Sequence, residues 1–350
     1  MASTAPSSSG WVPAPAVGLP QHVNIVALET VFTGLPPITL PAPHTFSLTV
    51  YERTHPDEVA ERLKDADIAI VTTVVITAKA LESCPRLRLI TAIVAGTDSL
   101  DLPACKARGI RVLNAPGANV DAVAEHAVGL YFAARRKVVP SMQQLHQGLW
   151  PERGTIIHSA LTNGNAPRSC RDETVAIVGY GGVGKRIVTL FKALGMKVII
   201  TGRKGQDSAP EGRVPFLEAL AVASVVVMCC PLDADTANLI STVEFAAMKQ
   251  ADCVLVNVAR GGVVDEEALL KALQSGQIGG AAVDVFAVEP AGPDTSPLLT
   301  PEVAASGLNL VVTPHTAWLA AQTKANQHVM LLENLNGFIT GDIVPERLRA

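Results

Sequence analysis

One stretch, residues 174–185, restricts the fold of this chain more than any other. It reads Thr-Val-Ala-Ile-Val-Gly-Tyr-Gly-Gly-Val-Gly-Lys, an apolar, β-branched run that ends in Gly-x-Gly-x-x-Gly. Apolar residues then recur at helical spacing over residues 186–194, so a strand, a glycine turn and a helix follow one another directly. That order is typical of the dinucleotide-binding turn of a Rossmann unit. Ordinary strand–helix turns carry glycines too, but this context favours a bound cofactor.

Each glycine of the motif has its own expected task. Gly179 permits the sharp turn, Gly181 lets the backbone approach a pyrophosphate, and Gly184 lets the helix pack on the strand. Gly182 and Val183 begin the helix, whose first N–H groups are available to phosphate oxygens. We therefore expect these five residues to bind the pyrophosphate of a dinucleotide.

The next strand, at residues 196–201, indicates which dinucleotide is bound. NAD-binding proteins usually carry Asp or Glu here, about 20 residues beyond the glycines, to bind the ribose hydroxyls. This chain instead reads Thr201, Gly202, Arg203 and Lys204. Arg203 can bind a 2′-phosphate through paired, charge-assisted hydrogen bonds. A solvated basic loop is the alternative. The position of Arg203 favours NADP(H) as the cofactor and does not exclude NAD(H).

The chain is long enough for two domains, with 350 residues of which 48% are hydrophobic and 17% charged. Continuous apolar runs, typical of buried parallel strands, alternate with helical patterns on both sides of the glycine motif. The remaining runs lie at 23–28, 46–51, 68–73, 89–93, 110–114, 225–230, 253–258, 280–285 and 310–313. We expect an α/β protein with two doubly wound parallel-sheet domains, a flavodoxin-like substrate domain and a Rossmann cofactor domain.

The pattern also predicts where the domains begin and end. The substrate (catalytic) domain is expected at 22–118 plus 319–350, and the dinucleotide-binding domain at 119–318. A long helix over 121–147 would lead into the second domain, and 150–172 would form a long loop. Residues 1–21 are rich in Ser, Pro and Ala without Lys or Arg, which predicts a disordered tail rather than a signal peptide.

Composition excludes several classes of partner. A net charge of −4 and a pI near 6.1 give no basis for binding nucleic acid or an acidic membrane. No apolar run reaches the length of a membrane-spanning helix. The six cysteines lack Cys-x-x-Cys spacing, so we expect reduced thiols, no metal site and a cytoplasmic protein.

Three later strands are each followed by a residue that could take part in catalysis. Arg260 follows the strand at 253–258, Glu289 the next strand, and His315 the last one. Because parallel strands end at one edge of a sheet, we expect the three side chains to share a crevice beside the cofactor. Arg260 can bind and polarise a 2-keto acid, His315 can protonate the developing alkoxide, and Glu289 can orient the imidazole.

At this point the chain resembles the D-2-hydroxyacid dehydrogenase family, and within it the NADP-linked glyoxylate/hydroxypyruvate reductases. The resemblance runs from about residue 87 to 336 and is carried by motifs at 95–98, 124–126, 179–184, 231–236, 258–265, 284–290 and 314–318. It implies reduction of glyoxylate, hydroxypyruvate or a related 2-keto acid to the D-2-hydroxy acid. In that reaction Arg260 binds the substrate carboxylate, Glu289 is the partner of the histidine, and His315 is the proton donor.

The resemblance implies further binding residues. The backbone of Val94, Ala95 and Gly96 would meet the substrate carboxylate, and Asp284 would face the nicotinamide amide. Other cofactor contacts are implied at Cys230, Pro231, Thr236, Val258 and Ala259. The long helix from residue 121 would build a homodimer. Residues 72–78 match the family only loosely, so the identity of the keto acid stays open.

Three alternative interpretations share parts of this pattern. The same fold also resembles transcriptional corepressors that sense a nucleotide and dimerise on binding it. Relatives that act on formate or phosphite are a second alternative, although a glutamine usually replaces Glu289 where formate is the substrate. Methyltransferases carry glycine-rich turns after a strand as well, but they do not need the Arg–Glu–His set.

Overall fold

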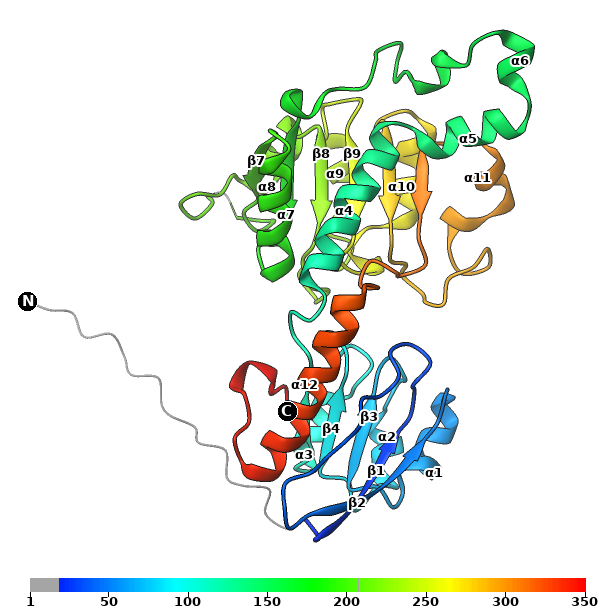
Figure 1. Ribbon diagram of the computed structural model, residues 1–350. Coiled ribbons are helices and arrows are strands. Elements are labelled where there is room, and N and C mark those ends of the chain that lie inside the picture. Colours follow the sequence, from blue (N-terminus) through cyan, green and yellow to red (C-terminus); the bar gives the residue numbers. More distant parts are fainter. Residues whose placement is uncertain (1–18, 207) are drawn as a thin grey trace, which may run out of the picture. The chain divides into compact units, whose positions relative to one another are not determined.

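The computed structural model describes residues 19–206 and 208–350. The chain forms two compact units (Figure 1), one comprising the described residues up to Asn119 together with Ala320–Ala350, the other Val120–Leu319. Most of the tail predicted at 1–21 lies outside the described residues. The last residue of that range, Gln21, accepts a hydrogen bond from the backbone N–H of Thr45 at 2.9 Å.

The first unit is built on a sheet of five parallel strands in the order β2-β1-β3-β4-β5, which is the flavodoxin-like order. The strands are β1 (His22–Ala27), β2 (Thr45–Val50), β3 (Ile68–Val71), β4 (Leu89–Ala92) and β5 (Arg111–Leu113). The helices are η1 (Pro56–Glu58), α1 (Val59–Leu63), α2 (Ala78–Glu82), α3 (Leu102–Ala107), α12 (Ala321–Thr340) and η6 (Pro345–Arg347).

Both faces of this sheet are covered. Side chains of α1, α2 and α3 pack on one face, whereas Leu331, Leu335 and Phe338 of α12 pack on the other against Ile25 and Leu89. A strand that is buried on both faces needs apolar residues at every position. This explains the continuous apolar runs in the sequence.

The second unit is built on six parallel strands in the order β11-β10-β9-β8-β6-β7. They are β6 (Thr174–Val178), β7 (Lys197–Ile200), β8 (Val225–Met228), β9 (Val254–Asn257), β10 (Gly280–Val283) and β11 (Leu310–Val312). Val214 forms an isolated parallel bridge with Thr201, which directly follows β7. It therefore stands where the third strand of the Rossmann order would pair.

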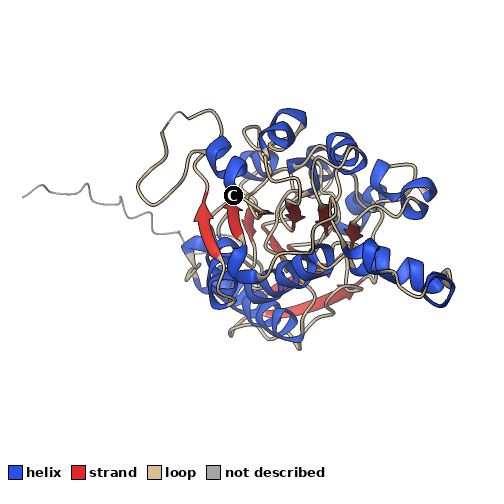
Figure 2. Ribbon diagram, turned by 90° about the horizontal axis from the view of Figure 1, so that it is seen from above, coloured by secondary structure: helices blue, strands red, loops and turns tan. Residues whose placement is uncertain are grey.

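Helices lie on both faces of the six-stranded sheet, as the view in Figure 2 shows. On one face are α4 (Val120–Arg135) and α7 (Gly182–Ala193), and on the other α8 (Phe216–Val222), α9 (Thr242–Ala247) and α10 (Glu266–Gln274). The remaining elements are α5 (Val138–His146), α6 (Leu149–Arg153), η2 (Ile157–Ala160), η3 (Cys170–Asp172), η4 (Gly261–Val263), η5 (Pro297–Leu299) and α11 (Pro301–Ala305).

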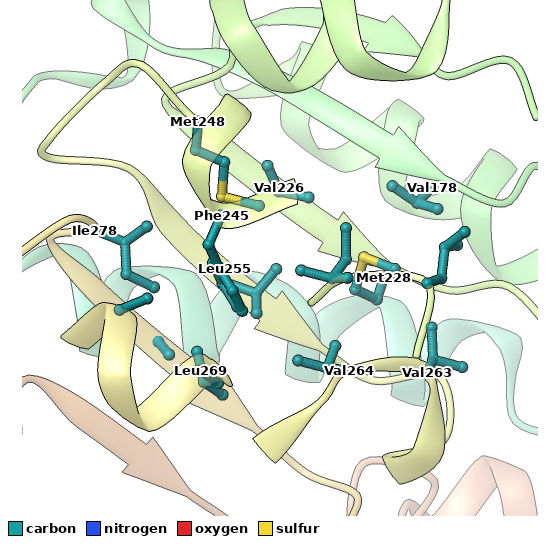
Figure 3. Close-up of a cluster of buried hydrophobic side chains, with 14 of the residues drawn as sticks. Val178, Val226, Met228, Phe245, Met248, Leu255, Val263, Val264, Leu269 and Ile278 are labelled. Carbon is teal, nitrogen blue, oxygen red and sulfur yellow. The ribbon is translucent and has the colours of Figure 1, made fainter. Parts of the chain in front are cut away.

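The core between this sheet and α8, α9 and α10 supports the edge where the candidate site lies. Figure 3 shows Val226 and Met228 of β8, Leu255 of β9, Phe245 of α9 and Leu269 of α10 meeting in this core. Each fully buried side chain of this kind contributes roughly 1.5–3 kcal/mol. The loops at the ends of these strands thus start from a rigid base.

Two details differ from the sequence-based expectation. The helix predicted over 121–147 is broken, because Lys137 has a left-handed backbone conformation (φ 50°) between α4 and α5. A new helix must begin shortly before Pro140, since proline is tolerated only in the first turn. The loop predicted at 150–172 contains α6, η2 and η3.

Candidate active site

The glycine turn after β6 leaves an open cradle at the start of α7. A Cβ atom at Gly179 (φ 101°) would lie 2.7 Å from the backbone nitrogen of Cys230, and one at Gly184 would lie 2.3 Å from the Gly179 carbonyl oxygen. A Cβ at Gly181, in contrast, would meet nothing within 4 Å. Gly181 is also the N-cap of α7 and supplies no capping side chain. The first N–H groups of the helix therefore suit a pyrophosphate.

The four residues predicted to bind the ribose and its 2′-phosphate follow β7 directly. Thr201 and Gly202 are buried, and Arg203 is exposed. The ammonium of Lys204 lies 2.9 Å from Oε1 of Glu244, whose side chain is only 2% exposed, and it also donates to the carbonyl oxygen of Leu239. The structure thus engages Lys204 with a buried carboxylate that the sequence pattern did not reveal.

The predicted cofactor residues after β8 and β9 lie at the same edge of the sheet. Thr236 closes the turn that begins with Cys230 and Pro231, because its Oγ1 donates to the Pro231 carbonyl oxygen at 2.8 Å. Burial raises the pKa of the Cys230 thiol to about 11, so the thiol stays protonated near neutral pH. Val258 and Ala259, after β9, are 7% and 6% exposed.

A buried asparagine shapes the loop that presents Arg260. Asn257 is 1% exposed; its Oδ1 accepts from the Ala259 N–H and its Nδ2 donates to the Arg260 carbonyl oxygen, each at 3.1 Å. A Cβ at Gly261 would lie 1.8 Å from the carbonyl carbon of Phe286. Only glycine lets the Arg260 loop lie this close to the loop after β10.

Glu289 and His315 form a direct pair. Nδ1 of His315 lies 2.6 Å from Oε2 of Glu289, and the backbone N–H of Phe286 donates to Oε1 of the same carboxylate at 2.9 Å. Burial alone would raise the pKa of Glu289. The hydrogen bonds from His315 and Phe286, together with the charges of His315 and Arg260, outweigh burial and hold this pKa below its ordinary value.

His315 itself has a left-handed backbone conformation, with φ 51°. For a non-glycine residue this costs on the order of 1 kcal/mol, so the surroundings must fix it. The carboxylate of Asp284 is 1% exposed and accepts hydrogen bonds from the N–H groups of Thr316 and Ala317 at 2.9 Å and from the Thr313 hydroxyl at 2.6 Å. The Asp284 carbonyl oxygen accepts the His315 N–H at 2.7 Å.

Asp284 therefore has a structural task beside the one the resemblance implies. Its carboxylate, expected to face the nicotinamide, shapes the turn that carries His315. Nε2 of His126 lies 3.1 Å from Oγ1 of Thr313 and 3.5 Å from Oδ1 of Asp284, which extends the network into α4. The motif at 124–126 was noticed in the sequence, but its spacing gave no signal for this contact.

In the first unit, the segment Val94–Gly96 follows β4 with its backbone partly engaged. The Val94 carbonyl oxygen accepts from the Ala115 N–H at 3.0 Å, and the Ala95 carbonyl oxygen accepts from Nδ2 of Asn114 at 2.6 Å. Within residues 19–206 and 208–350, no acceptor takes the N–H groups of Ala95 and Gly96. Two half-buried donors of this kind can bind an anion.

A buried carboxylate next to this segment was missed in the sequence. Glu29 is 7% exposed, and its Oε2 accepts from the Thr72 hydroxyl and from the N–H groups of Thr73 and Val74, each at 2.7 Å. The same segment continues beside the loop after β4, because the Ile76 N–H donates to the Ser99 carbonyl oxygen at 2.8 Å. Glu29 thus holds the segment that matches the family only loosely.

Comparison with known proteins decides the family. Residues 128–317 match the family described as "D-isomer specific 2-hydroxyacid dehydrogenase, NAD binding domain". The chain belongs to this family. It is 38% identical to the glycerate dehydrogenase of Methylorubrum extorquens over 300 residues. This aligned stretch covers 85% of this chain and 90% of the relative. It is 33% identical to the glyoxylate reductase of Korarchaeum cryptofilum over 292 residues, and the aligned stretch covers 82% of this chain and 84% of that relative.

Among solved structures, an NADPH-dependent glyoxylate/hydroxypyruvate reductase from Sinorhizobium meliloti, in complex with NADP and malonate, matches with a TM-score of 0.71. The two chains are 25% identical, and the match covers 91% of this chain and 94% of the other. These findings confirm the predicted family and the two-sheet α/β fold. The protein is an NAD(P)-dependent 2-hydroxyacid dehydrogenase.

Three further properties of this dehydrogenase concern metal sites, membrane-spanning helices and cysteines. In the described ranges, no group of three or more His, Cys, Asp or Glu side chains comes together in a way that could hold a metal ion. None of the helices in those ranges combines the length and apolar character needed to cross a bilayer. All six cysteines are free thiols.

Proposed function

We propose that this dehydrogenase reduces a small 2-keto acid, glyoxylate or hydroxypyruvate, to the D-2-hydroxy acid with NADPH. The observation that carries the proposal is the 2.6 Å pair between Glu289 and His315, with Arg260 close enough to lower the pKa of the carboxylate. The glycerate and glyoxylate named in its relatives support a small substrate. The NADPH-dependent reductase of Sinorhizobium meliloti supports the cofactor.

The mechanism follows from which atoms are already engaged. Nδ1 of His315 is bound to Glu289, so Nε2 is the nitrogen left to give a proton to the ketone oxygen. The reduced nicotinamide, when bound, supplies the hydride that C2 of the keto acid receives. His315 loses one proton in each turnover and regains it from solvent, to which its side chain is 41% exposed. Keto acid, NADPH and one proton thus give hydroxy acid and NADP⁺.

The substrate carboxylate is assigned to Arg260, because a guanidinium binds a carboxylate as a planar fork. In the first unit, taken by itself, the N–H groups of Ala95 and Gly96 are assigned to an anionic group of a substrate. Arg260 also polarises the ketone, which stabilises the charge that develops on its oxygen. Val94 takes part through its carbonyl oxygen, which accepts from the Ala115 N–H and so anchors the start of this segment.

For the cofactor, we assign the pyrophosphate to the glycine turn and the 2′-phosphate to Arg203. The open space at Gly181 and the close backbone approaches at Gly179 and Gly184 support the first assignment. The nicotinamide amide would have to donate to an Asp284 carboxylate oxygen that already accepts from Thr313, Thr316 or Ala317, so we place the main effect of Asp284 on His315. The remaining contacts are assigned to Thr201, Gly202, Cys230, Pro231, Thr236, Val258 and Ala259.

We further propose a homodimer formed through the arm made by α5 and α6. Val138, Met142 and Leu145 of α5 are spaced to lie on one side of the helix and are 41%, 51% and 46% exposed, and Trp150 of α6 is 55% exposed. Figure 1 shows α6 at the far end of this arm, away from the six-stranded sheet. An exposed apolar stripe on a projecting arm fits a second copy of the chain.

Initial rates test the function. Glyoxylate, hydroxypyruvate, phenylpyruvate and 2-ketoisocaproate are each reduced with NADPH and with NADH. We expect glyoxylate or hydroxypyruvate with NADPH to give the highest kcat/KM. In the Arg260→Ala and His315→Ala proteins, kcat/KM should be at least about 100-fold lower. Unchanged turnover in both variants, or tight nucleotide binding without turnover of any acid, would contradict the proposal.

A further inference from the structure

We infer that Arg213, rather than Lys204, is the second cation of the site for the 2′-phosphate of NADP(H). This inference rests on the proposed preference for NADP(H) and adds a residue that the sequence pattern around Gly202 does not contain. Two observations support it: the position of the Lys204 ammonium and the backbone bonds that hold Arg213 at the end of β7.

Lys204 is engaged elsewhere in the structure. Its ammonium pairs with Glu244 at 2.9 Å and donates to the Leu239 carbonyl oxygen at 3.2 Å. The Glu244 side chain is 2% exposed and also accepts from the N–H of Ser241, the N-cap of α9. A buried carboxylate without its cation is costly, so Lys204 is held as a counter-ion. A phosphate would have to take the ammonium away from this partner.

Arg213 is brought to the end of β7 by the backbone. The N–H of Val214 donates to the Ile200 carbonyl oxygen at 2.9 Å, and the N–H of Gly202 donates to the Val214 carbonyl oxygen at 2.7 Å. The N–H of Arg213 donates to the Pro210 carbonyl oxygen at 3.0 Å. These bonds fix the arginine beside the strand end, although it stands ten residues after Arg203 in the chain.

The guanidinium of Arg213 is directed to the same strand end. Its Nη1 donates to the carbonyl oxygen of Thr201 at 3.4 Å, while the residue remains exposed. Arg203 is exposed as well and follows Gly202 directly. The end of the second strand is where a Rossmann unit meets the ribose next to the adenine. Two guanidinium groups there match the charge and the oxygen acceptors of a phosphate monoester dianion.

Equilibrium binding tests this assignment without relying on turnover. Binding of NADPH, NADH and 2′-AMP is measured by calorimetry on the full chain and on Arg203→Ala, Arg213→Ala and Lys204→Ala. Arg213→Ala should weaken the binding of NADPH and of 2′-AMP about tenfold or more, and it should change the affinity for NADH by less than about twofold. Lys204→Ala should leave the ratio of NADPH to NADH affinity unchanged and lower the thermal midpoint, because it strands Glu244.

Lys197→Ala is the matched control, since it removes the same charge from the opposite end of β7, where the residue is exposed. It should change no affinity. If Arg213→Ala leaves the NADPH to NADH ratio unchanged, or if Lys204→Ala lowers it as far as Arg203→Ala does, the assignment of Arg213 is wrong. If the unmodified protein binds NADH as tightly as NADPH, the cofactor preference fails too, while keto acid reduction with NADH would still support the rest of the proposed function.

Discussion

The candidate groups at the carboxyl ends of the strands differ between the two sheets. After strands of the six-stranded sheet they are the side chains of Arg260, Glu289 and His315. After β4 of the five-stranded sheet they are the backbone N–H groups of Ala95 and Gly96. Hydrogen bonds hold the first set in place, and they also fix the left-handed backbone conformation of His315. The second depends on how its loops are folded. The residue types of the first set predict its chemistry directly, whereas Val94–Gly96 were predicted only through the family resemblance, because their side chains carry no charge.

The buried carboxylates at the two edges hold different kinds of segment. Asp284 in the second unit holds a strained turn and accepts from two backbone N–H groups and one hydroxyl. Glu29 in the first unit holds a loop through the same kinds of donor. We therefore expect changes at Asp284 to act on the rate of the chemical step, and changes at Glu29 to act on substrate affinity.

The largest expected effect comes from Gly261→Ala. The added Cβ would lie 1.8 Å from the Phe286 carbonyl carbon, so the loops of Arg260 and Glu289 must separate. We expect loss of kcat/KM by at least about 1,000-fold or failure to fold, because backbone cannot yield as a side chain can. Gly262→Ala is the control; its Cβ would meet only the end of the Leu232 side chain at 3.3 Å. Equal losses in both variants would contradict this account, as measured by steady-state rates and thermal melts.

Glu289→Gln should have the next largest effect. Loss of the charge that orients His315 should lower kcat about 100-fold while nucleotide affinity stays the same. Since the pKa of Glu289 is lowered in the folded protein, its stabilising effect is complete above the ordinary value of 4.5 and is lost as the pH falls through the lowered pKa. Urea melts should therefore show a difference between the two proteins at pH 5 that shrinks as the pH falls below 4.5. A difference that is as large at pH 3 as at pH 5 would refute this assignment.

In the first unit, Glu29→Gln should act mainly on substrate affinity. An amide cannot accept all the donors that Thr72, Thr73 and Val74 direct at the carboxylate, which should lower the free energy of unfolding by about 1–3 kcal/mol. We expect the KM for the keto acid to rise about tenfold, with kcat and NADPH affinity little changed. Glu52→Gln, an exposed position near the end of β2, is the control and should change neither. A loss confined to kcat would show that the segment acts on the chemical step instead.

The smallest expected effect on catalysis concerns the arm. Met142→Ser with Leu145→Ser should convert the proposed dimer to monomer in sedimentation velocity, while kcat stays within about threefold because Arg260, Glu289 and His315 lie on one chain. Val243→Ser is the control, since Val243 is 67% exposed on α9 and outside the arm. A chain that is already monomeric before mutation would remove the basis for this prediction.

Sequence patterns were sufficient for the features that are local or that follow from strand order. The glycine turn depends on residues close together in the chain, and the parallel order of β9, β10 and β11 brings Arg260, Glu289 and His315 to one edge. The family and the two-sheet fold followed from the same motifs and are confirmed.

The features that the sequence did not predict depend on contacts between distant residues. Lys204 finds Glu244 and Glu29 finds Thr72–Val74, each about 40 residues away in the chain, and no spacing rule marks such pairs. The left-handed conformations at Lys137 and His315 have no glycine to announce them, because the surrounding hydrogen bonds impose them. Such features appear only when the packed structure is known.

The most direct test of the central claim is a single-turnover measurement. NADPH bound to an excess of enzyme is mixed with hydroxypyruvate in a stopped-flow instrument, and loss of NADPH fluorescence follows one hydride transfer in the unmodified and His315→Ala proteins. The account predicts equal NADPH affinity and a hydride-transfer rate lowered by at least about 100-fold in the variant. An unchanged single-turnover rate would mean that His315 is not the proton donor and that the Glu289–His315 pair has another purpose.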